Sequence, residues 1–181
     1  AAYYAVRALT DPRIPTNGGC FRPVSLNLPE GSLVNPTAPA AVNARTVTIK
    51  RTCGCLIGAL AQALPERVPA PAATLSLIMA FAGRRRDGSP FISGELVAAG
   101  TGASDRSDGV DCLQTDGTNS MNLPVEALMM DAPIKVHRFG LRRDSGGAGA
   151  RRGGLGVVRE FEMLSGEVSF SHRGERHFTA A

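Results

Sequence analysis

Residues 134–164 read IKVHRFGLRRDSGGAGARRGGLGVVREFEML, and this stretch decides the fold. The runs at 134–141 and 155–164 have the length and apolar content of β-strands, and a glycine-rich loop separates them. Seven of the chain's 21 glycines lie between Gly140 and Gly156. Glycine permits positive φ and close approach of two backbones. We therefore expect a tightly packed loop in which several of Gly146, Gly147, Gly149, Gly153 and Gly154 have positive φ.

Outward from this loop, the later part of the chain continues as short strands, predicted at 74–81, 91–97 and 167–172. The earlier part is helical, with helices predicted at 1–9 and 44–64, the second from apolar residues spaced three and four apart. A strand-like run at 20–28 contains Pro23, which favours an edge or a bulge. The predicted fold class is α+β, with a helix-containing portion at 1–70 and a β-rich portion with glycine-rich loops at 71–181.

Composition limits the function classes. The chain has 181 residues, of which 43% are hydrophobic and 20% charged, as in ordinary globular domains. Its net charge of +4 is too weak to indicate nucleic-acid binding, and no apolar run reaches the ~18 residues of a membrane helix. Arginine supplies 18 of the 20 basic residues, which suits contacts with carboxylate or phosphate but also fits a bias in base composition.

The cysteines and the chain ends add two expectations. The four cysteines have no framework spacing, which favours free thiols in a reducing cytosol and thus a cytoplasmic protein. The chain begins at Ala1 without Met, lacks Trp and has only 5% aromatic residues, which is thin for a self-sufficient core. We expect a fragment of a larger subunit.

Three functional motifs can be excluded for the glycine-rich stretch. It has neither the Gly-Lys-Ser/Thr of a phosphate loop nor the Gly-x-Gly-x-x-Gly of a dinucleotide site. Asp144-Ser145-Gly146 occurs once, whereas aspartic-protease chemistry needs two facing carboxylates. We instead expect a buried Asp144 carboxylate that pairs with Arg142 or Arg152 and holds the loop's shape.

Two groups of potential metal ligands are weak. Asp105, Asp108 and Asp111 lie three apart, but they lack the alternate spacing and closing Glu of a calcium loop. A turn whose aspartates accept backbone N–H groups is the simpler interpretation. His172 and His177 lack a third protein ligand for zinc. We therefore expect no metal site in this chain.

Several short motifs, in order, resemble the hydantoinase B/oxoprolinase family, the B-type subunit of ATP-dependent hydantoinases, 5-oxoprolinases and related ketone carboxylases. The resemblance covers nearly the whole chain and the later part of the family's subunit. The motifs are NGGCFRPV (17–24), PEGSLVNP (29–36), PAAV (39–42), GALAQALP (58–65), SDGVD (107–111), TNSMNLPVE (118–126), DSGGAG (144–149) and RGGLG (152–156).

The resemblance implies an enzyme of two kinds of subunit. An A-type partner would hold ATP and Mg and phosphorylate the substrate, and the B-type subunit would then complete hydrolysis of a cyclic amide of the N-methylhydantoin or 5-oxoproline kind. A divalent metal would lie in the earlier part of the B-type subunit, so the isolated chain is expected to be inactive.

Three alternatives stay open. One is a subunit of an acetone or acetophenone carboxylase, and another is a non-catalytic assembly module. The third, a nucleic-acid binder using 151–154, lacks interleaved aromatic residues. We expect neither nucleic acid nor a membrane as a partner.

The resemblance and the polar loop residues together give a set of candidate site residues. We expect Arg22, Arg142 and Arg152 to stabilise an oxyanion or phosphate, and Asn119 and Asn122 to orient a polar substrate edge. Loop-locking hydrogen bonds are the alternative role for each. The substrate-binding or loop-organising candidates are Asn17, Arg22, Asp108, Asp111, Asn119, Asn122, Arg142, Asp144 and Arg152.

Overall fold

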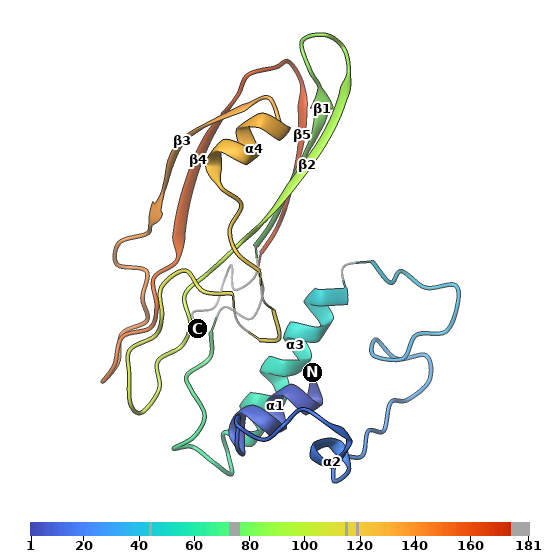
Figure 1. Ribbon diagram of the computed structural model, residues 1–181, viewed down its shortest axis with the longest axis vertical. Coiled ribbons are helices and arrows are strands. Elements are labelled where there is room, and N and C mark those ends of the chain that lie inside the picture. The colour runs from blue at the N-terminus through green and yellow to red at the C-terminus, as the bar shows by residue number, and fades with distance from the viewer. Residues whose placement is uncertain (44, 73–76, 115, 119, 175–181) are drawn as a thin grey trace. The chain divides into compact units, whose positions relative to one another are not determined.

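A computed structural model describes residues 1–43, 45–72, 77–114, 116–118 and 120–174. The chain divides into two compact units, Ala1–Val68 and Pro69–Ala181. Helices make up the regular structure of the first unit, whereas the second is built from strands and one short helix (Figure 1). The expected mixed class, with helices first and strands afterwards, is confirmed.

Two helices form the core of the first unit. Helix α1 (Ala2–Leu9) packs against α3 (Arg45–Leu60), burying Ala5 and Leu9 from one helix and Cys53 from the other. The helix predicted at 1–9 is confirmed. The helix predicted at 44–64 ends earlier than expected, because the chain leaves it at Leu60 in a turn. Residue 44 lies outside the described residues.

The strand predicted at 20–28 is wrong. Gly18–Phe21 form a short helix, α2, whose first turn is capped by Asn17. The Asn17 Oδ1 accepts hydrogen bonds from the backbone N–H groups of Gly19 and Cys20, at 3.0 and 3.3 Å. An asparagine in this position supplies an acceptor that a strand would not use, so local capping outweighs the apolar pattern.

The second unit holds two antiparallel sheets. One has the order β2-β1-β5, formed by Pro90–Val97, Leu77–Arg84 and Val168–Arg173. The other pairs β3 (Ile134–Leu141) with β4 (Val157–Met163). The strands predicted at 91–97, 134–141, 155–164 and 167–172 are confirmed. The strand predicted at 74–81 starts at Leu77 and runs on to Arg84, while 74–76 lie outside the described residues.

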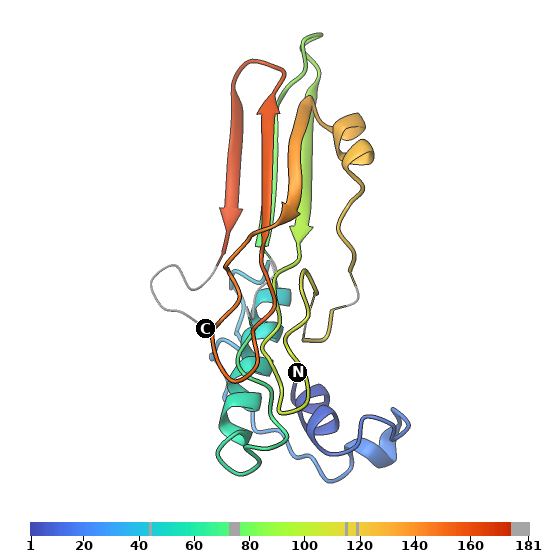
Figure 2. The same ribbon diagram turned by 90° about the vertical axis from the view of Figure 1, so that its left-hand side faces the viewer.

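The core of this unit lies between the two sheets (Figures 1 and 2). Phe81 is fully buried and meets Phe161 edge to face, with ring centroids 5.0 Å apart. Helix α4 (Val125–Asp131) adds the buried Leu128. This helix is absent from the sequence-based predictions, although Glu126 in its first turn is favourable there.

A buried ion pair links the two sheets inside this core. Glu95 of β2 accepts a hydrogen bond from Arg159 of β4, and the two side chains are only 1% and 3% exposed. The Arg159 guanidinium also lies 4.0 Å from the Phe139 ring centroid. Burial raises the pKa of Glu95, and the Arg159 charge partly opposes that rise. Strand alternation places Glu95 between the inward-facing Ser93 and Val97, so its inward position follows from the β-pattern.

Two further findings bear on the sequence-based expectations. Among the described residues, no helix combines the length and the apolar character needed to cross a bilayer. All of the cysteines, Cys20, Cys53, Cys55 and Cys112, are free thiols, as predicted.

Candidate functional site

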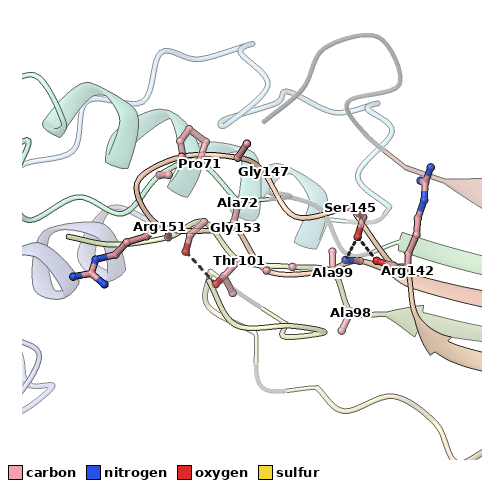
Figure 3. Close-up of a pocket in the computed structure, with 18 of the residues that line it drawn as sticks. Pro71, Ala72, Ala98, Ala99, Thr101, Arg142, Ser145, Gly147, Arg151 and Gly153 are labelled. Atoms are coloured by element: carbon pink, nitrogen blue, oxygen red, sulfur yellow. Dashed lines mark hydrogen bonds between the residues drawn. The ribbon is translucent and has the colours of Figure 1, made fainter. Parts of the chain in front are cut away.

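The candidate site lies where the strands of the second unit end and two loop segments meet. These segments, residues 98–113 and 142–156, are here called the loop cluster. They surround a pocket of about 440 Å³ together with residues 70–72, Leu77 and Val157 (Figure 3). The first segment continues from β2, and the second joins β3 to β4, so both sheets position the walls of the pocket.

Backbone hydrogen bonds hold the two segments together. Thr101 lies at the centre: its N–H donates to the Val110 carbonyl at 3.0 Å, and its carbonyl accepts from Gly154 N–H at 2.8 Å. The Thr101 hydroxyl also accepts from the N–H of Val110 at 2.8 Å. Gly109 N–H donates to the carbonyl of Arg152 at 2.7 Å. The pocket wall is therefore a bonded layer of backbone rather than a set of loose loops.

Two aspartates complete this layer from the first segment. The Asp108 carboxylate accepts from Arg152 N–H at 2.9 Å, and the Asp111 carboxylate accepts from Leu155 N–H at 2.7 Å. Asp111 also pairs with the Arg152 guanidinium at 3.2 Å. The Leu155 N–H, helped by Arg152, lowers the pKa of Asp111. The interpretation of these aspartates as acceptors of backbone N–H groups is confirmed, though the groups belong to the opposite segment rather than to their own turn.

The glycines of the loop cluster allow its two segments to pack closely. An added Cβ on Gly154 would overlap the Val110 carbonyl, and one on Gly100 would overlap Gly154 itself. A Cβ on Gly146 would likewise overlap the Gly153 carbonyl. The expected tight packing is confirmed. The expectation of positive φ is wrong, because none of the predicted glycines has a positive φ: Gly146, Gly147, Gly149, Gly153 and Gly154.

Asp144, rather than a glycine, takes the left-handed conformation in this loop, with φ of 58°. Its side chain is exposed, and among the described residues it has no ion pair. The prediction of a buried Asp144–arginine pair is therefore wrong. The carboxylate that pairs with Arg152 is that of Asp111, because the backbone layer brings residues 108–111 against residues 152–155.

Ser145 closes the second segment on itself. Its hydroxyl donates to the Arg142 carbonyl at 2.7 Å and accepts from Gly156 N–H at 2.9 Å, as the dashed lines of Figure 3 show. Neither Ser145 nor Thr101 was among the site residues predicted from the sequence. A hydroxyl residue inside a glycine-rich run was the available signal, because such a residue can satisfy backbone groups that glycine leaves open.

Asn122 ties the cluster to the chain that precedes α4. Its side-chain carbonyl accepts from Ala98 N–H at 3.1 Å, and its amide donates to the Cys112 sulfur at 3.2 Å. Both ends are thus used within the protein, which favours the loop-locking role. Asn119 lies outside the described residues.

The remaining candidates belong to the first unit. Asn17 caps α2, and Arg22 follows that helix with an exposed side chain. The structure thus brings Asp108, Asp111, Asn122, Arg142, Asp144 and Arg152 to or beside the loop cluster.

The charge around the pocket comes from arginines. Arg142 and Arg151 are the charged residues that line it, and the rest of the lining consists mainly of alanine and glycine. Arg151 Nε donates to the Asp105 carbonyl at 2.9 Å. The two guanidinium groups point away from each other, on opposite sides of the labelled loop (Figure 3). The site is thus a small-residue pocket with two arginines in its lining, whose guanidinium groups extend outward from the labelled small residues (Figure 3).

The described residues do not assemble a metal centre. No three His, Cys, Asp or Glu side chains within the described ranges come together in a way that could hold an ion. His137 instead pairs with Glu162 across β3 and β4, at 2.9 Å. His177 lies outside the described residues. The described residues by themselves therefore offer no set of three such ligands for a divalent metal.

The chain is similar in sequence to several known proteins. It is 36% identical over 169 residues to the caprolactamase subunit beta of Pseudomonas jessenii, covering 89% of this chain and 29% of that one. It is 31% identical over 164 residues to 5-oxoprolinase 1 of Arabidopsis thaliana, covering 90% of this chain and 12% of that one. This chain therefore spans less than a third of either relative.

Two solved structures share the fold. The crystal structure of ATP-dependent caprolactamase from Pseudomonas jessenii matches with a TM-score of 0.77 and 32% identity, over 89% of this chain and 29% of that one. Nucleotide-free acetone carboxylase matches with a TM-score of 0.78 over 97% of this chain and 24% of that one, and at 19% identity this likeness concerns the fold alone. The sequence model of the hydantoinase B/oxoprolinase family matches residues 1–181, and the chain belongs to that family.

Proposed function

We propose that this chain is part of the B-type subunit of an ATP-dependent cyclic-amide hydrolase of the N-methylhydantoinase or 5-oxoprolinase type. In this proposal an A-type partner holds ATP and Mg and activates the amide, and the B-type subunit completes ring opening. The observation that carries the proposal is the family match along the whole chain. The identity to a caprolactamase subunit supports an amide substrate.

The loop cluster suits a supporting role in that reaction. Breakdown of an activated amide places negative charge on oxygen, and fixed donors stabilise such charge most effectively. The bonded backbone layer keeps the pocket wall fixed, and Arg142, whose side chain carries a guanidinium, belongs to the pocket lining. Within the described residues this guanidinium has no hydrogen bond or ion pair, so it is available to an anionic group. We assign Arg142 to binding and the two aspartates to positioning.

The metal expected for this family is proposed to lie elsewhere in the subunit, because the residues described here do not fit one. No step of the proposal passes through it. The free thiols support a cytoplasmic location.

A carboxylase subunit is the second candidate. The likeness to acetone carboxylase favours it, but this likeness concerns the fold alone. A non-catalytic assembly role is the third and predicts that no residue of the loop cluster affects turnover.

The reaction type can be tested on the complete B-type subunit reconstituted with its A-type partner. We expect ATP-dependent ring opening of hydantoin, 5-oxoproline or a related lactam that does not depend on bicarbonate. Turnover of a ketone only when both ATP and bicarbonate are present would overturn the hydrolase assignment in favour of the carboxylase.

A further inference from the structure

Among the described residues of the second unit, one face of the three-stranded sheet points away from the hydrophobic core. The side chains of β2, β1 and β5 alternate, and those that point away from β3 and β4 form what is here called the outer face. The strand registers align Ile92 with Ala82 and Ser169, and Gly94 with Ala80 and Ser171. The members of the outer face are Ile78, Ala80, Ala82, Ile92, Gly94, Leu96, Ser169 and Ser171.

The outer face lacks the features of a surface that meets water. It has no charged side chain between Arg84 at one end and Arg173 at the other, whereas about a quarter to a third of ordinary surface residues are charged. Ile92, which lies on the edge strand β2, is 83% exposed. Exposed apolar edge strands invite pairing with other chains, so natural proteins cover or charge them.

The shape of the outer face also favours close packing. Gly94 and Ala80 lie opposite each other in neighbouring strands, with Ser171 beyond them, so the middle row carries only small side chains. The flanking rows carry the larger Ile92 on one side and Leu96 on the other. Small side chains in the middle row let an apolar element approach the sheet closely.

We propose that the outer face docks an apolar, uncharged surface contributed by another part of the same B-type subunit. The length of the relatives supports this occupant. In the solved caprolactamase the matched region makes up 29% of the chain, so most of that subunit consists of further chain outside this fold. Interfaces between separate subunits carry charged groups in their rims, whereas the outer face has no charged side chain between Arg84 and Arg173. The inference rests on the proposed membership of a longer B-type subunit.

Cysteine labelling of the complete B-type subunit tests this proposal without its A-type partner. The variants Ile92→Cys and Ser169→Cys place a thiol on the outer face, while Met130→Cys is the control because Met130 is an equally exposed apolar residue on α4, at 84%. The maleimide labelling rate of each site is measured by peptide mass and divided by its rate in urea. This ratio corrects for intrinsic thiol reactivity, and the peptide mass separates each site from the native cysteines.

We expect both outer-face cysteines to react at least about tenfold more slowly in the folded subunit than in urea, because the docked element must open first. The Met130→Cys site should stay close to its urea rate. Full reactivity at both outer-face positions would overturn the proposal. So would protection that appears only after the A-type partner is added, or only at high protein concentration, since these outcomes identify a partner subunit or a second copy. The rates require no turnover, so their outcome is independent of whether the enzyme is a hydrolase or a carboxylase.

Discussion

At the scale of single residues, Asp111 is the carboxylate on which the loop cluster depends. It accepts the Leu155 N–H at 2.7 Å and pairs with the Arg152 guanidinium, joining both segments of the cluster. Asparagine in its place keeps an acceptor but loses the charge. We therefore expect Asp111→Asn to lower the melting temperature of the complete subunit at neutral pH.

The same substitution predicts a pH dependence. The pKa of Asp111 is lowered from 3.8 in the folded state, chiefly by the Leu155 N–H. The stabilising contribution of the Asp111 carboxylate is therefore present above pH 3.8, and it is lost as the pH falls through the lower pKa of the folded state. The difference in melting temperature between the parent and Asp111→Asn should shrink below pH 3.8. Asp105→Asn is the control, because among the described residues the Asp105 carboxylate pairs only with the neighbouring Arg106, at 3.6 Å. An equal effect of the control would contradict this account.

Asp144 gives the opposite prediction. Its side chain is exposed and its φ is 58°, a conformation that asparagine tolerates and alanine resists. We expect Asp144→Asn to change the free energy of unfolding by no more than about 0.5 kcal/mol, and Asp144→Ala to cost about 1–2 kcal/mol. Denaturant titration of both variants measures the difference. Equal stability of the two variants would show that the backbone conformation carries no penalty.

Residue roles were only partly predictable from the sequence. The aspartates at 108 and 111 were recognisable as acceptors of backbone N–H groups because their spacing lacks the alternate ligands and closing Glu of a calcium loop. Their partners lie about 44 residues away in the sequence, and local reasoning does not reach a tertiary contact of that kind. The same limit explains the error at Asp144, where arginines close in sequence were taken for partners.

At the scale of elements, the glycine-rich loop is built for close backbone contact, and Gly154 is its tightest point. A Cβ at this position would overlap the Val110 carbonyl and approach the Thr101 nitrogen. We expect Gly154→Ala to destabilise the second unit by about 1–3 kcal/mol or more, because backbone must move. Gly147→Ala is the matched control, since nothing lies within 4 Å of its added Cβ. Equal unfolding midpoints for the two variants would contradict the packing role.

The buried pair between the sheets supplies a second prediction at this scale. Glu95→Gln leaves the Arg159 charge buried without its partner, at an expected cost of about 3–5 kcal/mol. Removing both charges in Glu95→Leu with Arg159→Met should recover most of that loss. A double-mutant cycle on the free energy of unfolding measures the coupling. Additive effects of the two substitutions would show that the pair is not coupled.

Elements with strong periodicity were predictable and short ones were not. The strands of the second unit follow from apolar runs bounded by glycine, and α1 from an uninterrupted helical pattern. Helix α2 was mistaken for a strand because a single cap at Asn17 outweighs the pattern of its few residues. Helix α4 is only seven residues long, and its stability comes from burying Leu128 in the core rather than from its own sequence.

At the scale of the whole molecule, a bonded pocket wall with two arginines in its lining is proposed to serve chemistry on an activated amide. The sequence resemblance predicted the family, and the whole-chain match confirms it. The pocket itself could not be predicted, because its walls come from segments that meet only through the tertiary fold.

The central claim is that the pocket of the loop cluster handles the substrate, and Arg142 tests it most directly. In the reconstituted two-subunit enzyme, Arg142→Gln removes the guanidinium of an arginine that lines the pocket. Arg143→Gln removes the neighbouring exposed arginine, which does not line the pocket. The measurement is kcat/KM for ATP-dependent ring opening, alongside the melting temperature of each variant. We predict a loss of roughly tenfold or more for Arg142→Gln, about the worth of one charge-assisted hydrogen bond, with unchanged melting and a normal Arg143→Gln enzyme. An Arg142→Gln enzyme with parental kcat/KM would contradict the claim.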